Sequence, residues 1–345
     1  MFKRLVGNDQ VKYGLRHLLA NSRVPNSILF AGDDGVGKRQ FAIELAKSLV
    51  CASPSDLEAC DVCPACRRAE TSAMPRPDDR DAYKRVIFSD HPDVGFVLPF
   101  NRNILVDAIR HLESEANFRP YESKARFFII DGADKMNDSA ANALLKTLEE
   151  PPTTTHIFLI TSRPDSLLPT IRSRCQTVRF APVEGAEVER YLIEQRAFSH
   201  DEAQLGARLS RGSIGRAVSI NFEKFKTRRE KMLAVLTNVL ATGDRAALLK
   251  IAEELNDAKN KDSFEDSVDL LQSLIHDVWA LKVTGDDHRV VNTDLIERLA
   301  ALAANSGSKD LPKWLADIDV MRENFAVNIN RKVAADALFV SMSAN

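Results

Sequence analysis

The sequence predicts an α/β protein in which a P-loop nucleotide fold fills the first half and helices alone build the second half. A glycine-rich loop at residues 32–38 follows a strand-like apolar run and opens a helical pattern. Strand-like and helical patterns alternate as far as Pro182, and only helical patterns follow it. Alternation of strands and helices around such a loop indicates a mainly parallel sheet wrapped by helices.

The strand-like runs all precede Pro182. They are Ser27–Ala31, Val86–Phe88, Gly95–Leu98, Arg126–Asp131, His156–Thr161 and Thr177–Phe180. Helical patterns lie between them. One spans Arg39–Val50, and a second has apolar residues at i, i+1, i+4, i+5 and i+8 from Ile104. A third begins after Asn137, which is a good N-cap, and ends before Pro151.

The pattern after Pro182 is helical throughout. Two short helices are expected at Glu184–Arg196 and Asp201–Arg211, and the turn Gly212–Ala217 leads into a third. Later helices are expected at Thr227–Leu240, Ala246–Ala258, Phe264–Val283, Asp294–Asn305, Pro312–Phe325 and Arg331–Met342.

The length of 345 residues allows two or three domains. The patterns divide the chain into an α/β domain at residues 1–182, a small helical lid at 183–225 and a larger helical domain at 226–345. Apolar residues make up 44% and charged residues 28%, which are ordinary values for a globular protein.

Charge and cysteine content exclude several classes of protein. Lys and Arg total 47 against 49 Asp and Glu, so the net charge of −2 argues against a surface coated with basic residues. A local DNA-facing patch is still compatible with this balance. No apolar run approaches a membrane span, the N-terminus has no signal-peptide core, and five cysteines do not suggest a disulfide framework. A cytoplasmic protein without membrane partners is therefore expected.

The glycine-rich loop reads Gly32-Asp33-Asp34-Gly35-Val36-Gly37-Lys38 and fits the phosphate-binding pattern G-x-x-x-x-G-K. Its glycines let backbone N–H groups curl around phosphate oxygens, and the helix N-terminus that follows adds positive potential. The pattern then requires Ser or Thr, whose hydroxyl holds magnesium, but Arg39 stands there. The sequence therefore predicts a nucleotide cradle with a defective metal site.

A second departure from the nucleotide-site pattern follows the run Arg126–Asp131. This run reads as a buried strand that ends in a carboxylate, which is the usual second half of a P-loop site. In hydrolysing proteins of the D-E-x-x type, the next carboxylate orients the attacking water, but Gly132 stands at that position here. Asp134, Glu149 and Glu150 occur nearby, but none of them is at that position. Arg39 in place of the hydroxyl and Gly132 in place of the carboxylate together favour a protein that kept the P-loop fold but lost the ability to hydrolyse nucleotide.

Four cysteines, Cys51, Cys60, Cys63 and Cys66, form the pattern C-x8-C-x2-C-x2-C directly after the P-loop helix. Four thiolates at this spacing suit tetrahedral zinc, and the absence of a catalytic histidine nearby indicates a structural site. Iron–sulfur proteins also use C-x2-C-x2-C, although their further x3-Cys-Pro is absent here. Four reduced thiols in a loop are the third interpretation. A zinc module at residues 51–66 is the one we predict.

These features in this order resemble the bacterial DNA polymerase III clamp loader family. Val6-Gly7-Asn8 resembles the V-G-Q that begins the family's nucleotide domain, and the cysteine cluster is similar to the family's zinc module. Residues 142–152 resemble the family's most characteristic stretch, and Ser173-Arg174-Cys175 matches its S-R-C motif. The delta-prime branch is the most similar, because motor subunits carry G-K-[ST] and D-E where this chain carries Lys38-Arg39 and Asp131-Gly132.

The resemblance implies an AAA+ protein at one end of a five-subunit ring, which uses ATP to open the sliding clamp and place it on primed DNA. The implied partners are the gamma/tau-type motor subunits, the delta subunit, the clamp and the DNA, and the C-terminal helices would form a collar. In this family the Arg of S-R-C reaches the neighbouring subunit's ATP site, so the resemblance implies that Arg174 is an arginine finger in trans. A guanidinium there stabilises transition-state charge.

Two further positions follow from the resemblance. Thr161-Ser162 falls where the family's sensor of the γ-phosphate lies, although a hydroxyl at the end of a strand often satisfies its own loop. In active relatives a lid arginine touches phosphate, and its position corresponds to Gly215 here. Arg216 follows one residue later, which is a rotation of about 100° on a helix and would point its side chain away from the site. No intrinsic ATPase is therefore expected, and the chain would join a nucleotidyltransferase assembly without carrying out the reaction.

Three alternatives stay open. Lys38 either clamps phosphate in a site that binds ATP or ADP weakly, or is a remnant paired with Asp131. The chain could be an active AAA+ motor subunit in which Asp134 or Glu149 replaces the missing Glu and a water replaces the hydroxyl on magnesium. A P-loop kinase for a small molecule would explain residues 32–38 but neither the S-R-C motif nor the helical second half.

Overall fold

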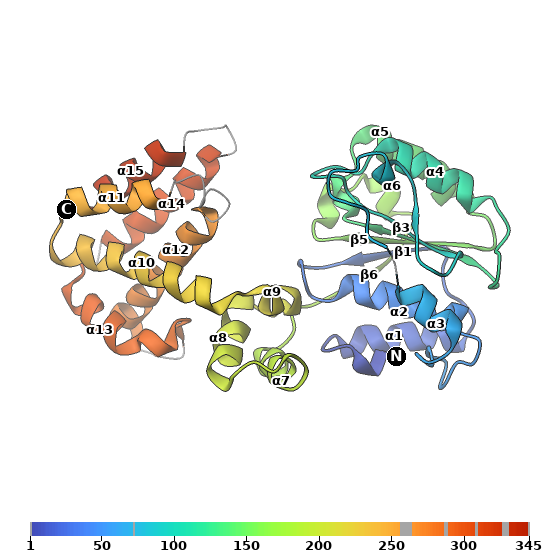
Figure 1. Ribbon diagram of the computed structural model, residues 1–345, viewed down its shortest axis with the longest axis horizontal. Helices are drawn as coiled ribbons and strands as arrows, with labels where there is room; N and C mark the ends of the chain where they lie inside the picture. The colour runs from blue at the N-terminus through green and yellow to red at the C-terminus, as the bar shows by residue number, and fades with distance from the viewer. Residues whose placement is uncertain are drawn as a thin grey trace. The chain divides into compact units, whose positions relative to one another are not determined.

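The computed structural model of the protein describes residues 2–71, 73–255, 264–285, 289–307, 310–325 and 331–343. The chain forms two compact units, Met1–Val218 and Ser219–Asn345. The first unit contains a sheet covered by helices, and the second is helical (Figure 1). The predicted α/β nucleotide fold with a helical C-terminal region is confirmed. No helix among the described residues is long and apolar enough to span a membrane.

The first unit is organised around a six-stranded sheet with the order β2-β3-β4-β5-β1-β6. The strands are β1 Ser27–Ala31, β2 Ile87–Phe88, β3 Val94–Val97, β4 Arg126–Asp131, β5 Thr155–Thr161 and β6 Gln176–Arg179. All pairings are parallel except that of β2 with β3. Strand β1 lies between β5 and β6, with Ile28 opposite both Phe158 and Gln176. Parallel pairing brings the carboxyl ends of β1, β4 and β5 to one edge of the sheet.

Helices cover both faces of this sheet (Figure 1). The helices of the first unit are α1 Asp9–Ala20, α2 Lys38–Val50, α3 Pro64–Glu70, α4 Val106–Ala116, α5 Asp138–Glu149, α6 Pro169–Arg172, α7 Gly185–Arg196, α8 His200–Ser210 and α9 Ile214–Ser219, with 3-10 turns at Phe2–Arg4, Ala82–Lys84, Ala133–Lys135 and Pro164–Ser166. Side chains alternate along β1, so Phe30 packs with α1 and α2 while Leu29 packs with α4 and α5. Both faces of the central strands are therefore buried.

Most predicted elements are present with shifts of one or two residues at their ends. Asn137 caps α5, because its side chain accepts a hydrogen bond from the N–H of Ala140 at 2.9 Å. Helices α1, α3 and α6 have no counterpart among the predicted elements. Helix α1 nevertheless carries a helical signal, since its buried residues Val11, Leu15 and Leu19 repeat at every fourth position.

The second unit is built from helices around one apolar core. They are α10 Phe222–Ala241, α11 Arg245–Leu255, α12 Phe264–Thr284, α13 Ile296–Asn305, preceded by the 3-10 turn Thr293–Leu295, α14 Asp310–Phe325 and α15 Arg331–Met342. Trp314 is among the largest side chains in this core. The helix predicted at Ala246–Ala258 corresponds to α11, and residues 256–258 lie outside the described part of the chain.

A buried carboxylate ties the start of β3 to the loop before β4. Asp93 is fully buried and accepts hydrogen bonds from the N–H groups of Tyr121, Glu122 and Ser123 at 2.8, 2.9 and 2.9 Å. The Ser123 hydroxyl donates a further bond at 3.0 Å. Burial alone would raise the pKa of Asp93, but these donors outweigh burial and hold the pKa below its ordinary value.

We predict that Asp93→Asn lowers the free energy of unfolding of the first unit by about 2–4 kcal/mol at neutral pH, because an amide cannot accept all four bonds. Since the folded-state pKa is lowered, the carboxylate stabilises fully above its unfolded-state pKa of about 3.9, and this contribution is lost as pH falls through the folded-state value. The deficit of the variant should therefore shrink below about pH 4.

Amide hydrogen exchange in β3 and β4 measures this deficit. Tryptophan fluorescence does not, because Trp279 and Trp314 both lie in the second unit. Asp78→Asn changes an exposed aspartate in the same unit and serves as the control. Equal protection in both variants at neutral pH would contradict the role assigned to Asp93.

Candidate nucleotide site and cysteine cluster

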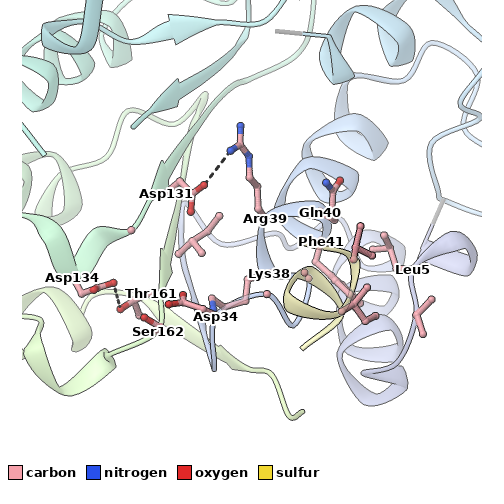
Figure 2. A pocket seen from close by; sticks show the side chains of 18 of the residues that line it. Leu5, Asp34, Lys38, Arg39, Gln40, Phe41, Asp131, Asp134, Thr161 and Ser162 are labelled. Atoms are coloured by element: carbon pink, nitrogen blue, oxygen red, sulfur yellow. Dashed lines mark hydrogen bonds and ion pairs between the residues drawn. The ribbon is translucent and has the colours of Figure 1, made fainter. Parts of the chain in front are cut away.

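A cavity of about 700 Å³ lies at the carboxyl edge of the sheet, and residues far apart in the sequence form its wall (Figure 2). Of the predicted nucleotide-site residues, Gly35, Gly37, Lys38, Asp131 and Thr161 line it. Gly32, the first residue of the loop after β1, is not part of the wall. The order of the strands thus brings these residues, which are far apart in the sequence, to one cavity.

The P-loop has the backbone conformation that its glycines permit. Gly32, Gly35 and Gly37 have φ angles of 155°, 79° and 100°, in a region that other residues seldom adopt. The ammonium group of Lys38 donates hydrogen bonds to the carbonyl oxygens of Gly32 and Asp33, both at 2.6 Å. Burial lowers the pKa of Lys38, although the nearby carboxylates, Asp34 first among them, oppose this. Lys38 therefore holds its own loop curled.

Asp131 is paired with Arg39 and not with Lys38. The Arg39 guanidinium donates a hydrogen bond from Nη1 to Oδ2 of Asp131 at 3.3 Å, and the two side chains point toward one another in Figure 2. The same guanidinium lies over the Phe96 ring, 5.4 Å from its centroid. The residue that replaces the magnesium-binding hydroxyl therefore neutralises the carboxylate that usually faces the metal.

Thr161 and Asp134 form a second polar pair at this edge. The Thr161 hydroxyl donates to Oδ1 of Asp134 at 2.9 Å and accepts from the N–H of Arg163 at 3.0 Å. The Arg163 guanidinium donates to Oδ2 of Asp134 at 3.1 Å. Burial would raise the pKa of Asp134, but these donors hold it below its ordinary value. The Thr161 hydroxyl is thus used in hydrogen bonds within its own surroundings, and Asp134 is bound by a threonine and an arginine.

The turn that precedes and opens α9 touches the P-loop through Ser213 and Gly215. The N–H of Gly215 donates to the carbonyl oxygen of Gly35 at 2.9 Å, and the Ser213 hydroxyl donates to that of Asp34 at 2.7 Å. A Cβ atom added to Gly35 would lie 2.2 Å from the Ser213 oxygen, and one added to Gly215 would lie 3.0 Å from the Gly35 Cα. A side chain at position 215 would therefore require the Gly35 backbone to move away by a few tenths of an ångström. Arg216 is exposed and lies outside the cavity wall.

Arg174 lies outside the cavity wall. It follows α6 and is exposed, and its guanidinium is 2.6 Å from Oε1 of Glu149 at the end of α5. It also donates to the carbonyl oxygen of Thr170 at 2.9 Å. These two contacts hold the guanidinium at the surface. Glu149, one of the two carboxylates considered as replacements for the missing Glu, is likewise absent from the wall of the chain's own cavity.

The four cysteines after α2 form one cluster. All four Sγ atoms lie within 4.8 Å of one another, and the sulfurs of Cys51 and Cys63 are 3.9 Å apart. The N–H groups of Cys60, Cys63 and Cys66 each donate to the sulfur of the preceding cysteine at 3.3–3.4 Å. Burial opposes ionisation of Cys63, but N–H donors from Cys66 and Ala52 outweigh it and lower its pKa to about 6. The cluster can hold a metal ion.

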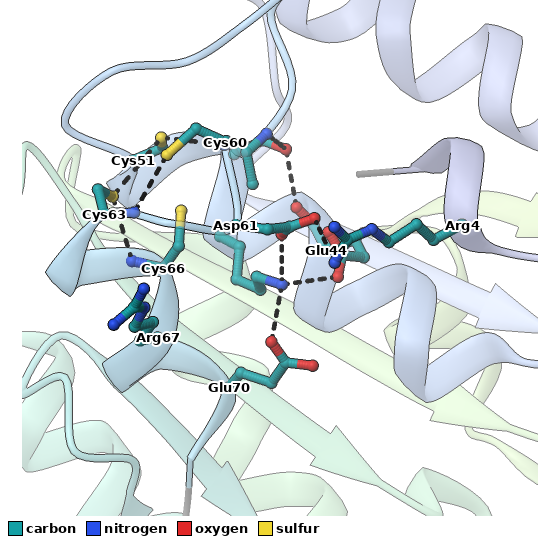
Figure 3. A network of polar contacts seen from close by, with 12 residues as sticks. Arg4, Glu44, Cys51, Cys60, Asp61, Cys63, Cys66, Arg67 and Glu70 are labelled. Atoms are coloured by element: carbon teal, nitrogen blue, oxygen red, sulfur yellow. Dashed lines mark hydrogen bonds and ion pairs between the residues drawn. The ribbon is translucent and has the colours of Figure 1, made fainter.

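A buried lysine of the P-loop helix binds the loop that carries this cluster. Figure 3 shows its carboxylate partners Glu44, Asp61 and Glu70 close to the four cysteines. Lys47 of α2 is 1% exposed, and its ammonium lies 2.8 Å from carboxylate oxygens of Glu44 and Asp61 and 3.1 Å from Glu70. Burial opposes the charge, but the hydrogen bonds that Lys47 donates to Asp61 and Glu44 outweigh it and raise the pKa of Lys47. Sequence reasoning did not identify this network, because a lysine within a helix has the appearance of a surface residue.

Comparison with known proteins agrees with these features. A family model described as "DNA polymerase III, delta subunit" matches residues 7–184, and one described as its C-terminal part matches residues 223–336. "DNA polymerase III subunit delta'" of Bacillus subtilis is 30% identical over 318 residues, covering 92% of this chain and 90% of that protein. The Escherichia coli protein of the same name is 29% identical and covers 96% and 90%.

Subunits named gamma/tau or tau are also similar, over a smaller share of their length. "DNA polymerase III subunit gamma/tau" of Mycobacterium tuberculosis is 30% identical over 94% of this chain, but only 54% of that protein is covered. Two findings decide the assignment. The family models match both units, and the alignments with the delta-prime relatives cover most of this chain and most of each relative. The chain belongs to the DNA polymerase III delta-prime subunit family.

Proposed function

We propose that this protein is a non-hydrolysing clamp loader subunit that presents Arg174 to the ATP site of a neighbouring subunit. The observation that carries the proposal is the ion pair between Arg39 and Asp131. It occupies the two positions from which a P-loop ATPase holds its magnesium ion. A site whose metal-binding carboxylate is already neutralised by a protein cation is poorly suited to magnesium-dependent hydrolysis.

The surroundings of Arg174 support a role in trans. A finger that served the chain's own nucleotide would have to reach its own cavity, and Arg174 is not part of that wall. Glu149 and the Thr170 carbonyl orient the guanidinium at an exposed position. This arrangement keeps a positive charge available for a γ-phosphate bound by an adjacent subunit. On making that contact, the Arg174 guanidinium would either leave Glu149 or bind Glu149 and the phosphate together.

The partners we propose are the gamma/tau-type motor subunits, the delta subunit, the sliding clamp and primed DNA, and the proposed location is the cytoplasm, where these partners act.

Three domains would serve this role: an AAA+ domain at residues 1–182, a lid at 183–225 and a collar at 226–345. The lid proposal is supported by its own small apolar core, which contains Val183, Val188, Leu192, Ala203, Ala207 and Ala217. The collar proposal is supported by the separate core of the second unit.

Zinc is the metal we propose for the cysteine cluster. A Zn–S distance of about 2.3 Å places the sulfurs of a tetrahedral site about 3.8 Å apart, and the Cys51 and Cys63 sulfurs are 3.9 Å apart. Four thiolate ligands leave no open coordination position, so the ion would be structural. Because Asp61 lies within the cluster loop and binds Lys47, the metal would also brace the P-loop helix.

An active motor subunit is the second function to consider. It requires a carboxylate that orients water at the end of β4. Asp134 is bound to Thr161 and Arg163, and Glu149 is bound to Arg174 outside the cavity, so neither is arranged as a replacement. These contacts favour the non-hydrolysing role.

We predict that Arg174→Ala sharply lowers the DNA-stimulated ATPase of the reconstituted ring, because arginine fingers contribute on the order of 10³–10⁵ in rate where they act. Phosphate release by the complete complex measures the loss. Arg172→Ala is the matched control, since Arg172 is two residues away and pairs with exposed Asp165. If both variants reduced the ATPase equally, Arg174 would have no specific role.

The purified chain by itself should release no phosphate from ATP above the background of its Lys38→Ala variant. The Arg39–Asp131 pair leaves no vacant metal position, and Gly132 supplies no carboxylate for water. A sensitive phosphate assay with magnesium in excess measures this. Turnover that is present in the natural chain and abolished in the variant would assign the chain to the motor class.

We predict that Cys63→Ser reduces bound zinc from about one ion per chain to a small fraction and destabilises the first unit by about 3 kcal/mol or more. Elemental analysis and hydrogen exchange measure the two effects. Cys175→Ala is the control, because Cys175 is buried and is not one of the four cluster cysteines. Iron with acid-labile sulfide, or full metal content in Cys63→Ser, would refute the zinc assignment.

A further inference from the structure

Lys47 is a buried cation at which three segments of the chain meet. Its side chain is 2% exposed, and its ammonium lies 2.8 Å from Oε1 of Glu44, 2.8 Å from Oδ1 of Asp61 and 3.1 Å from Oε2 of Glu70. Glu44 belongs to the same helix, α2, whereas Asp61 lies in the loop between α2 and α3, and Glu70 ends α3. The lysine therefore binds both the loop and α3 to α2.

The same three segments carry the four predicted metal ligands. One cysteine follows α2 directly, two flank Asp61 in the loop, and one lies in α3 a helical turn before Glu70; they are Cys51, Cys60, Cys63 and Cys66. In Figure 3 the carboxylates of Glu44, Asp61 and Glu70 converge beside these sulfurs. Each segment that supplies a sulfur is thus fixed to one ammonium group.

Asp61 has a backbone conformation that needs such support. Its φ angle is 62°, in the left-handed region that residues with a Cβ atom seldom adopt. The turn lies between Cys60 and Cys63, where the N–H of Cys63 donates to the Cys60 sulfur at 3.3 Å. Arg4 also binds Asp61, with Nη1 3.3 Å from Oδ2. Two cations therefore hold the residue at the centre of the turn that presents two sulfurs.

The energetics of this cluster favour a role in positioning over a role in stability. Removing an ammonium and its carboxylate partners from water costs much of what their attraction returns, so apolar side chains of similar volume often stabilise a fold as well. The side chains of Glu44 and Asp61 are only 11% and 4% exposed, and either would be a buried charge without Lys47. The cluster therefore fixes its members in one arrangement.

We propose that Lys47 is a positioning residue for the metal, which holds the three cysteine-bearing segments at ligand distance and so sets how tightly zinc is bound. The inference deepens the proposed zinc site and rests on it. Ligands that are already oriented lose less free energy when the ion binds. Lys47 is not itself a ligand, because an ammonium group has no lone pair to donate.

The test measures the zinc affinity of the full chain by competition with a chromophoric chelator. Lys47→Met keeps an unbranched side chain but removes the ammonium, and its zinc affinity should fall by about 10- to 100-fold, as for other groups that orient metal ligands. Asp61→Asn keeps the shape of the residue and its tolerance of a left-handed backbone, so a loss of the same order measures the link to the loop alone.

Glu70→Gln breaks the link to α3 alone. Because the Glu70 side chain is 64% exposed, we expect a smaller loss of zinc affinity, of about two- to fivefold. The two single-link variants, Asp61→Asn and Glu70→Gln, carry the test in the event that Lys47→Met does not fold.

Cobalt substitution separates positioning from stability. Four thiolates around cobalt in a tetrahedron give strong visible absorption bands, whose energy and intensity follow the ligand geometry. At saturating cobalt the bands of Lys47→Met should be shifted or weakened relative to those of the natural chain, because the sulfurs are no longer held in one arrangement. A lysine that only stabilised the fold would leave the spectrum of the saturated chain unchanged.

Two controls make the outcome decisive. Lys84→Met removes a lysine that also pairs with a carboxylate three residues earlier, but outside the cysteine-bearing segments. Asp93→Asn destabilises the same unit through bonds to the loop before β4. Both variants should bind zinc as the natural chain does.

Three results would each overturn the inference: natural zinc affinity in both Lys47→Met and Asp61→Asn, an unchanged cobalt spectrum in Lys47→Met, or an equal loss of affinity in Asp93→Asn. A natural chain that binds no zinc would instead overturn the metal assignment in the proposed function. The two failures are therefore distinguishable.

Discussion

Parallel pairing of β1 with both β5 and β6 is the constraint on which the rest of the first unit depends. It buries β1 on both faces, since Leu29 and Phe30 belong to apolar cores on opposite sides of the sheet. It also directs the carboxyl ends of β1 and β5 to one edge, and the parallel pairing of β4 with β5 directs the end of β4 there. These pairings bring the P-loop, Thr161 and Asp131 together. The cavity is a consequence of how the sheet is ordered.

The charges at this edge are arranged differently from those of a metal-dependent P-loop site. Lys38 is bound by carbonyl groups of its own loop, Asp131 by Arg39, and Asp134 by Arg163 and Thr161. Each carboxylate is thus neutralised within the chain. In contrast, Arg174 is held at an exposed position outside this cavity. The chain neutralises its own site internally and holds Arg174 in a defined position at the surface, and this arrangement supports the non-hydrolysing role that we propose.

Local patterns predicted much of the fold, because helix caps, apolar periodicity and glycine spacing act over a few residues. The cap at Asn137 and the strands of the sheet are examples. Helix α1 shows the limit of that approach. Its first turn follows Asn8, a residue type preferred at the N-cap, but Asn8 has a left-handed backbone and its side chain bonds the backbone of Ala181 and does not cap the helix, which the local sequence does not reveal. The cysteine spacing predicted a cluster correctly, and the Lys47 network that anchors it has no local signature.

The sequence by itself determined that this chain carries a phosphate-binding loop, that Arg39 and Gly132 replace a hydroxyl and a carboxylate, and that four cysteines lie close enough along the chain to cluster. These are matters of residue identity and short spacing. Only the tertiary structure decided that Asp131 pairs with Arg39 and not with Lys38, and that Gly35 meets Gly215. Such pairs join segments that are distant along the chain, and their partners are set by which strand and helix ends the folded sheet brings into contact.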